Sequence, residues 1–413
     1  MKTILLGMAL ALVTAAASAD DRYIVQHRFS GPDGLDPQAA LTLGPDGKLY
    51  GTTLLGGTTD RGTIFRFDPA SGKLTTIHNF TEEEGSQPID RLLLASDGYF
   101  YGTTRYGGSD DFNCVDGCGT IYRIRPSGDK FSVQHFMSFG QGTTLQGGLI
   151  EGSDGRLYGT ASLGGPFACH DSQARCGTAY AFSPKTKSLT VLHGFRFTDG
   201  RGPIGRLLLA SNGFLYGVTT SGATSERGVV YRLKPDGTKF QVLVEFANTN
   251  AGCQPTSGLI QASDGKLYGA AIDCGAHGAG TLYSLTLDGA IAPIYHFNAD
   301  GRLGDGSGPA AEPLEIDGKL YGTAKNGGLP ANDPNRIGTL FRVGLDGTGF
   351  ELLHTFFGIT HNEGLRKGQH HDGAQPTTGL TLGPDGNLYG TTPAGGLLPW
   401  PGKGVVYKYR LSD

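Results

Sequence analysis

Eleven histidines are the first candidates for chemistry in this chain, because imidazole changes its charge near neutral pH without any perturbation. Five recur at one position of a repeated segment, which indicates a structural role: His27, His78, His135, His193 and His354. His296 lies one place from that position and is expected to be structural too. The other five lie in segments of variable length: His170, His277, His361, His370 and His371. Acid–base or metal-binding histidines are expected in this second group.

The longest variable segment, Phe357–Pro376, reads FGITHNEGLRKGQHHDGAQP and holds three of these histidines. Long irregular segments in compact proteins are usually functional or disordered. A later segment contains the only tryptophan, between two prolines. Its indole ring is either a platform that stacks on a sugar or part of the local packing, and the sequence favours neither. The hypothesis is that His370 and His371 are catalytic and that four residues bind a ligand: His361, Arg366, Arg336 and Trp400.

A second group of polar residues falls in the variable segments of the second and third repeats: Arg105, Tyr106, Asp110, Asp111, His170 and Arg175. Tyrosine or histidine with arginine is the combination that a polysaccharide lyase requires. The base removes the proton next to a uronate carboxylate, and the cation neutralises that carboxylate and acidifies the carbon. This hypothesis assigns catalytic roles to Arg105, Tyr106, His170 and Arg175. The alternative is a pair of solvated loops with incidental charges.

Six cysteines predict three disulfides, because such pairs are typical of exported chains. In two pairs both cysteines share a variable segment. In the third, Cys253 precedes the first strand of the fifth unit and Cys274 lies in the loop between its second and third strands. The expected bonds are therefore Cys114–Cys118, Cys169–Cys176 and Cys253–Cys274. A zinc site is the alternative, but the spacings of three and six intervening residues fit zinc-finger patterns poorly. No metal and no cofactor is predicted.

Several functional classes find no support in the sequence. There is no serine nucleophile elbow, no phosphate-binding Gly-Lys loop and no His-Glu-x-x-His motif. The net charge of −4 and the absence of a basic stripe argue against nucleic acid as a partner.

The elements that carry these residues are set by a repeat. Leu-Tyr-Gly or a close variant recurs seven times, with tyrosines at Tyr50, Tyr101, Tyr158, Tyr216, Tyr268, Tyr321 and Tyr389. In each unit a short apolar stretch leads into a two-residue Asp-Gly or Asn-Gly turn, such as Asp46–Gly47, followed by the tyrosine segment. Third and fourth apolar stretches follow, such as Gly62–Phe67 and Leu74–Phe80. This grammar predicts an all-β, seven-bladed β-propeller with four antiparallel strands per blade.

The two ends of the chain predict how the ring closes. The seventh unit ends after its third strand, at GVVYKYRLSD. The segment Tyr23–Phe29, YIVQHRF, matches the fourth strands of other units, such as LTTIHNF and FELLHTF. The N-terminal strand is therefore expected to complete the last blade.

The tandem pattern DGxLYGTTxxGGxxxxGTxF resembles the GloVer repeat of exported bacterial proteins, and the resemblance covers essentially the whole mature chain. It implies a propeller-like repeat but no shared catalytic set. Function is therefore expected in residues that depart from the repeat.

The connections differ in length on the two faces of the ring. Links between the first and second strands and between the third and fourth are tight, and they form the turn face. Links between the second and third strands, and between one unit and the next, are long and variable, and they form the long-loop face. Because binding residues concentrate on variable loops of rigid scaffolds, function is expected there.

The first 19 residues read as a signal peptide, and residues 20–413 as a single propeller domain. The expected protein is periplasmic or secreted, without a membrane span, and a monomer. The leading hypothesis is that the long-loop face binds a carbohydrate or a cell-envelope polymer. The alternatives are an enzyme, a lyase or hydrolase of an acidic polysaccharide, and a protein-docking scaffold.

Overall fold

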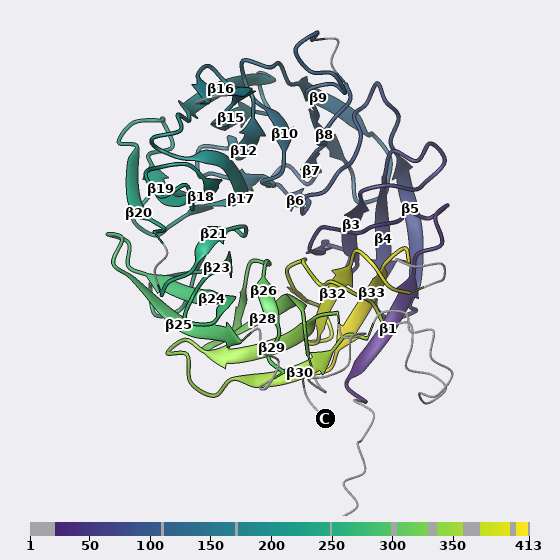
Figure 1. The fold of residues 1–413 in the computed structure, drawn as a ribbon. Coiled ribbons are helices and arrows are strands. Elements are labelled where there is room, and N and C mark those ends of the chain that lie inside the picture. Colours follow the sequence, from purple (N-terminus) through teal and green to yellow (C-terminus); the bar gives the residue numbers. More distant parts are fainter. Residues whose placement is uncertain are drawn as a thin grey trace, which may run out of the picture.

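The computed structural model describes residues 21–108, 111–169, 172–247, 250–298, 304–328, 337–357, 372–396 and 402–411. Seven antiparallel sheets stand around a central axis, as the ribbon in Figure 1 shows. This confirms the predicted all-β, seven-bladed propeller, in which the four strands of each blade are arranged side by side from the centre to the rim.

The first four blades follow the chain in order. Blade 1 contains β2 (Thr42–Leu43), β3 (Leu49–Thr53), β4 (Thr63–Asp68) and β5 (Lys73–Asn79). Blade 2 contains β6 (Leu93–Leu94), β7 (Phe100–Thr103), β8 (Thr120–Ile124) and β9 (Ser132–Phe136). Blade 3 contains β10 (Thr143–Leu145), β11 (Ile150–Glu151), β12 (Leu157–Leu163), β15 (Thr178–Ser183) and β16 (Ser188–Gly194). Blade 4 contains β17 (Arg201–Leu209), β18 (Leu215–Ser221), β19 (Val229–Leu233) and β20 (Gln241–Glu245).

The last three blades repeat the scheme. Blade 5 contains β21 (Cys253–Pro255), β22 (Ile260–Gln261), β23 (Leu267–Asp273), β24 (Gly278–Leu285) and β25 (Ile291–Asn298). Blade 6 contains β26 (Ser307–Pro309), β27 (Leu314–Ile316), β28 (Lys319–Asn326), β29 (Thr339–Gly344) and β30 (Glu351–Thr355). Blade 7 contains β31 (Thr381–Leu382), β32 (Leu388–Thr392), β33 (Val405–Tyr409) and β1 (Tyr23–Arg28). In blades 3, 5 and 6 the innermost strand is split into two short pieces.

The core lies in and between the blades, and the Leu-Tyr-Gly segment explains how they pack. On the second strand, the glycine leaves room for an aromatic ring from the third strand. A Cβ atom at Gly102 would lie only 2.3 Å from the Tyr122 hydroxyl, and one at Gly51 would lie 2.5 Å from Phe65. Both rings are fully buried. The repeated glycine is therefore a packing requirement of each blade.

The repeated tyrosine joins neighbouring blades. Tyr50 donates a hydrogen bond to Asp46 of its own hairpin, at 2.9 Å, and its hydroxyl lies 3.0 Å from the carbonyl oxygen of Pro126 in blade 2. The same tyrosine–aspartate bond recurs in four other blades: Tyr101–Asp97, Tyr158–Asp154, Tyr268–Asp264 and Tyr389–Asp385. The repeated tyrosines thus connect neighbouring blades.

The first hairpin turns differ from the prediction. Two-residue Asp-Gly turns were expected, but in blade 1 only Gly47 has a positive φ, and Gly44 hydrogen-bonds to Lys48 across a longer turn. Asp46 accepts a bond from the Lys48 backbone N–H, which accounts for the aspartate. The two-residue form occurs in blade 6, where Asp317 and Gly318 both have positive φ and Ile316 pairs directly with Lys319.

The five repeated histidines lie in the fourth strands and hold the following loop. His27 Nε2 lies 2.7 Å from Asp33, and equivalent contacts link His78 to Glu84 and His193 to Asp199, both at 3.2 Å. Three of the imidazole rings also stack on an aromatic ring, as His193 does on Phe240 at 3.6 Å. These contacts match the structural role that the sequence indicated.

The N-terminal strand closes the ring as predicted. β1 pairs antiparallel with β33, with Tyr23 opposite Tyr409 and Arg28 opposite Val405. In Figure 1 the purple strand lies beside the yellow ones, so the two ends of the chain share blade 7.

Candidate functional site

Three disulfides hold segments of the long-loop face. The bonds are Cys114–Cys118, Cys169–Cys176 and Cys253–Cys274, which confirms the predicted pairing. Cys169 ends β13 (Ala168–Cys169), which forms a small hairpin with β14 (Ser172–Arg175) outside the blades. The covalent links and this hairpin give the loops of blades 2 and 3 a fixed shape.

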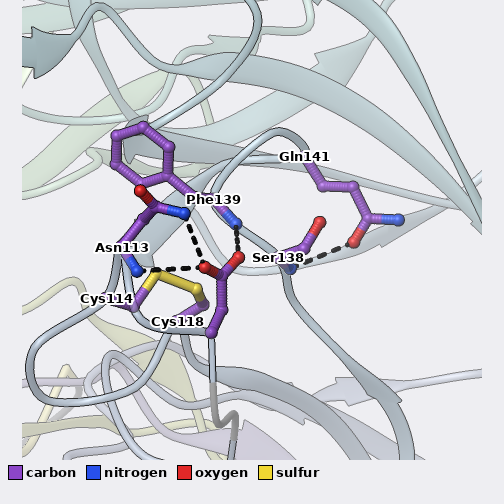
Figure 2. Close-up of a disulfide and its surroundings, with 7 residues drawn as sticks. Asn113, Cys114, Cys118, Ser138, Phe139 and Gln141 are labelled. Carbon is purple, nitrogen blue, oxygen red and sulfur yellow. Dashed lines mark hydrogen bonds between the residues drawn. A yellow bond between two sulfur atoms is a disulfide. The ribbon is translucent and has the colours of Figure 1, made fainter.

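The loop over residues 111–118, called the stapled loop because the Cys114–Cys118 bond closes it, is also held by a carboxylate (Figure 2). Asp111 accepts hydrogen bonds from the backbone and side-chain amide of Asn113, at 3.0 and 2.9 Å. Its other oxygen accepts from the backbone N–H of Phe139, at 3.0 Å, in the connection to blade 3. These bonds, led by the one from Phe139, lower the pKa of Asp111. Asp111, which the sequence placed among the charged candidates, thus has a structural task.

A cleft of about 210 Å³ lies between the loops of blades 2 and 3. Tyr106 and Arg175, two of the predicted catalytic residues, both line it. The wall also contains Asn113, Val115 and Asp116 of the stapled loop, Phe139 of the connection to blade 3, and Thr143 and Thr144 of β10. The structure therefore brings together two residues that are distant in the sequence.

The arginines of this region have different surroundings. Arg175 donates to the carbonyl oxygen of Pro166 at 2.5 Å, and its guanidinium lies 5.7 Å from the centre of the Phe139 ring. Arg105 places its guanidinium 4.9 Å from the centre of the Tyr106 ring. Arg105 does not line the cleft, and its Nε is buried without a partner in the described part of the chain. Arg175 is thus the cation of the cleft, and Arg105 supports the tyrosine.

Two apolar side chains project from the stapled loop. Phe112 is 92% exposed and Val115 is 96% exposed, whereas most large apolar side chains of the described chain are buried. Val115 also lines the cleft. A rigid loop therefore presents apolar surface to solvent at the edge of the cleft.

His277, one of the candidate histidines, is described, and the centre of its ring lies 6.4 Å from that of His296. The remaining predicted site residues lie outside the described residues. They are His170, His361, His370 and His371 among the histidines, with Arg336, Arg366 and Trp400. Their roles stay predictions.

The central channel holds a cluster of charges that the sequence interpretation missed. Its cavity of about 400 Å³ is lined by residues from all seven blades. Many wall residues are small, including Ala40, Gly148, Gly258 and Gly379. Four long charged side chains also line the channel: Arg91, Arg206, Glu312 and Glu315. Arg206 Nη2 and Glu312 Oε1 form an ion pair at 2.7 Å. The attraction of Glu312 raises the pKa of Arg206.

A comparison of the seven repeats at one position could have found this cluster. In each blade, one residue of the first strand pairs with the repeated tyrosine, and the position compared lies two places before that residue. In four blades this position holds Ala40, Gly148, Gly258 or Gly379. In the other three it is Arg91, Arg206 or Glu312. Small residues are needed where the inner strands converge, so long charged side chains there are departures from the repeat.

Asp90, next to Arg91, also lines the channel. Burial raises its pKa to about 6, against the opposing effect of hydrogen bonds from the Gly148 backbone and the Thr103 hydroxyl. The Thr103 bond measures 2.9 Å. Asp90 is therefore engaged between blades 2 and 3.

Two clusters of potential metal ligands occur in the described part of the chain. One combines Asp111 with Cys114 and Cys118, and the other combines Asp273 with Cys253 and Cys274. Both contain a disulfide, whose sulfur atoms are not the thiolates that bind metal. Neither cluster therefore fits a metal ion.

Solved structures with a similar fold include enzymes with carbohydrate-related names. Oligogalacturonate lyase from Vibrio parahaemolyticus aligns with 11% identity and a TM-score of 0.55, over 92% of this chain and 90% of that one. Oligogalacturonate lyase in complex with manganese aligns with 14% identity and a TM-score of 0.55, over 94% and 93%. The Niastella koreensis GH74 enzyme aligns with 13% identity and a TM-score of 0.58, over 88% of this chain and 52% of that one. At these identities the likeness concerns the fold alone.

No curated protein has a matching sequence. Among the described residues, no helix has the length and apolar character needed to cross a membrane. The family model described as the Gloeobacter/Verrucomicrobia repeat matches residues 12–169, 167–367 and 257–413. The chain therefore belongs to the Gloeobacter/Verrucomicrobia repeat family.

Proposed function

We propose that this protein is an exported propeller whose long-loop face binds a carbohydrate or a cell-envelope polymer. The observation that carries the proposal is the cleft between blades 2 and 3, which both Tyr106 and Arg175 line. Sites for organic ligands are concave and combine apolar or aromatic walls with a few placed polar groups. This cleft has that composition.

The chemistry of the wall suits a sugar. The Tyr106 ring offers an apolar face with a polar tip, which fits the mixed surface of a pyranose. Arg175 supplies several N–H donors in a fixed plane, suited to hydroxyl groups or to a uronate carboxylate. The exposed Phe112 and Val115 extend the apolar surface beyond the cleft, along which a polymer can continue.

The cleft is built to keep its shape. The Cys114–Cys118 and Cys169–Cys176 bonds flank it, and Asp111 ties the stapled loop to Phe139. Loops that are rigid before binding lose less conformational entropy when the ligand arrives. Stapling therefore favours a binding role for this part of the long-loop face.

The three disulfides also support the proposed location. Such bonds persist in oxidising compartments, such as the periplasm or the extracellular medium.

The proposal is tested by affinity gel electrophoresis of the mature protein in gels that contain neutral or acidic polysaccharides. We expect at least one polymer to retard the wild type, and Arg175→Gln to reduce the retardation of an acidic polymer more than that of a neutral one. Unretarded migration through every polymer would leave the proposal without support.

One contact favours a second candidate function, cleavage of an acidic polysaccharide by a lyase. Arg105 lies over the Tyr106 ring, and Tyr106 and Arg175 line the same cleft, so a base and a cation are available there for proton removal beside a uronate. An enzyme of this kind would increase ultraviolet absorbance as unsaturated uronate forms, and Tyr106→Phe would abolish the increase. Binding without any such increase would favour the binding protein.

A protein-docking role is less well supported. Docking surfaces are contiguous apolar patches of several hundred Å². On the described long-loop face, the exposed apolar residues of the stapled loop are Phe112 and Val115, beside polar cleft residues. These two side chains fit the rim of a ligand cleft better than a docking patch.

A further inference from the structure

The central channel contains an arginine, Arg91, that forms no ion pair with a carboxylate of the described residues. In the described part of the chain, the hydrogen bond of the Arg91 guanidinium is to the Thr381 hydroxyl of blade 7, at 3.2 Å. No acidic group of the described residues lies within ion-pair distance of it. A guanidinium has five N–H donors, so most of those of Arg91 are left for water or a ligand.

The acids that line the channel have partners elsewhere. Glu315 accepts a hydrogen bond from the Ser263 backbone N–H at 2.8 Å. Glu312 is paired with Arg206 at 2.7 Å. Asp90 accepts from Thr103 at 2.9 Å and from the Gly148 backbone N–H. Arg206 runs beside Gly148, whose Cβ position would lie 3.7 Å from the arginine Cγ and Cδ atoms. The pKa of Arg91 is lowered to about 10, mainly because the side chain is buried and next because Arg206 carries the same positive charge. An incoming anion would relieve this repulsion.

The channel has the size and access of a ligand site. Its volume of about 400 Å³ falls within the range of roughly 300–1,000 Å³ that is usual for small-molecule pockets. The Arg206 and Glu312 side chains remain 31% and 22% exposed, so solvent reaches the charges. Small residues such as Ala40 and Gly379 leave the space in front of the wall open.

We propose that the central channel binds a small carboxylate of sugar-acid size, which Arg91 holds through paired N–H donors with Arg206 as a second cation. Arginine is suited to this role because its planar fork matches a carboxylate. One unneutralised cation matches a monoanion, whereas Glu312 in the same wall opposes a phosphate dianion. The site is separate from the cleft between blades 2 and 3, and it stands or falls independently of the function proposed there.

Isothermal titration calorimetry of the mature protein at neutral pH tests this site with four probes: D-glucuronate, D-galacturonate, D-glucose and inorganic phosphate. We expect one of the two uronates to bind, glucose not to bind, and phosphate to bind more weakly than the uronate. Arg91→Gln should weaken uronate binding by at least about tenfold, as expected for the loss of a charged hydrogen-bond donor. Arg91→Lys should cause a smaller loss, because it keeps the charge without the fork.

Two control variants separate this site from other effects. Arg61→Gln removes the same charge from a surface ion pair with Glu82 and should leave uronate binding unchanged. Tyr106→Ala alters the cleft alone and should also leave it unchanged. The proposal is overturned if neither uronate binds the wild type, if phosphate binds more tightly, or if the Arg91 variants bind like the wild type. An equal loss in Arg61→Gln would overturn it too. Should Arg91→Gln fail to fold, Arg91→Lys decides.

Discussion

The backbone N–H of Asp36 in blade 1 donates to the carbonyl oxygen of Lys403 in blade 7 across 3.0 Å. The same bond joins other neighbouring blades, as between Gln87 and Arg61 at 3.0 Å and between Gln254 and Arg227 at 2.9 Å. The seam between the first and last blades is therefore built like the others. This continuity places the long loops of the described blades on one common face.

Ring closure predicts a large effect of Tyr23→Ala. The Tyr23 ring stacks on His354 with centroids 3.7 Å apart, and its hydroxyl donates to the Asp372 carbonyl oxygen. Loss of the ring should lower the free energy of unfolding by about 3 kcal/mol, the usual cost of truncating a packed aromatic side chain. Urea denaturation measures it. Tyr99→Ala, on the turn face of blade 2, should cost less, and equal stability of Tyr23→Ala and the wild type would argue against closure through β1.

Contact between blades predicts different costs for two glycine substitutions. Gly62 and Gly98 both have positive φ, but a Cβ at Gly62 would lie 2.4 Å from the Thr53 carbonyl oxygen and 2.7 Å from Pro88 of blade 2. A Cβ at Gly98 would meet nothing within 4 Å. Gly98→Ala should cost about 1 kcal/mol from backbone strain alone, and Gly62→Ala at least about 3 kcal/mol. Similar melting temperatures for the two variants would show that the contact between blades is loose.

The disulfides should divide into a stabilising one and a shaping one. Cys253–Cys274 spans 21 residues and Cys114–Cys118 spans 4. The chain entropy of the unfolded state then predicts how much each double serine variant lowers the free energy of unfolding. The loss is about 3 kcal/mol without Cys253–Cys274 and about 2 kcal/mol without Cys114–Cys118. Polysaccharide retardation should nevertheless fall only in Cys114→Ser/Cys118→Ser, because that bond shapes the cleft. Denaturation curves and gel retardation on both variants check this, and the opposite assignment would contradict it.

Asp90 predicts a dependence of stability on pH. Burial raises its pKa from 3.8 to about 6, so the folded protein holds this proton more tightly than the unfolded chain. Ionisation of Asp90 therefore lowers stability as the pH rises from about 4 to 6, and the full penalty applies above that range. Asp90→Asn should stabilise the protein above about pH 6, by up to about 3 kcal/mol, and have no such effect below about pH 4.

Melting temperatures across this pH range measure the difference. Asp68→Asn is the control, because a backbone hydrogen bond from Ala70 lowers the pKa of Asp68. It should not stabilise the protein at neutral pH. A gain in Asp90→Asn that does not change with pH would show that the carboxylate is not the cause.

Much of the fold could be predicted because the same pattern of strand and turn residues occurs seven times in the chain. The closing strand could be predicted from the segment YIVQHRF, because its histidine and phenylalanine occupy the same positions as those of LTTIHNF. Two disulfides could be predicted because both cysteines lie in one loop, and the third because Cys253 and Cys274 were the two that remained. The first turns were mispredicted because Asp-Gly also suits a longer turn, in which Asp46 accepts the Lys48 N–H.

The sites were harder to predict than the fold. Tyr106 and Arg175 were singled out by residue type, but only the arrangement of blades 2 and 3 places them in one cleft. Arg91 and Arg206 escaped notice because their segments pass for ordinary first strands. Their importance arises where seven inner strands converge, a relationship between blades that no single segment contains.

The most direct test of the account compares polysaccharide affinity in the wild type, Tyr106→Ala and Tyr99→Ala. Tyr106 lies in the cleft of the long-loop face, whereas Tyr99 lies on the turn face of the same blade. There the Arg123 guanidinium carbon lies 4.4 Å from the centre of the Tyr99 ring. With the polymer that retards the wild type, the account predicts a loss of at least about tenfold in affinity for Tyr106→Ala, equivalent to one aromatic contact, and none for Tyr99→Ala. Undiminished affinity in Tyr106→Ala, or an equal loss in Tyr99→Ala, would contradict it.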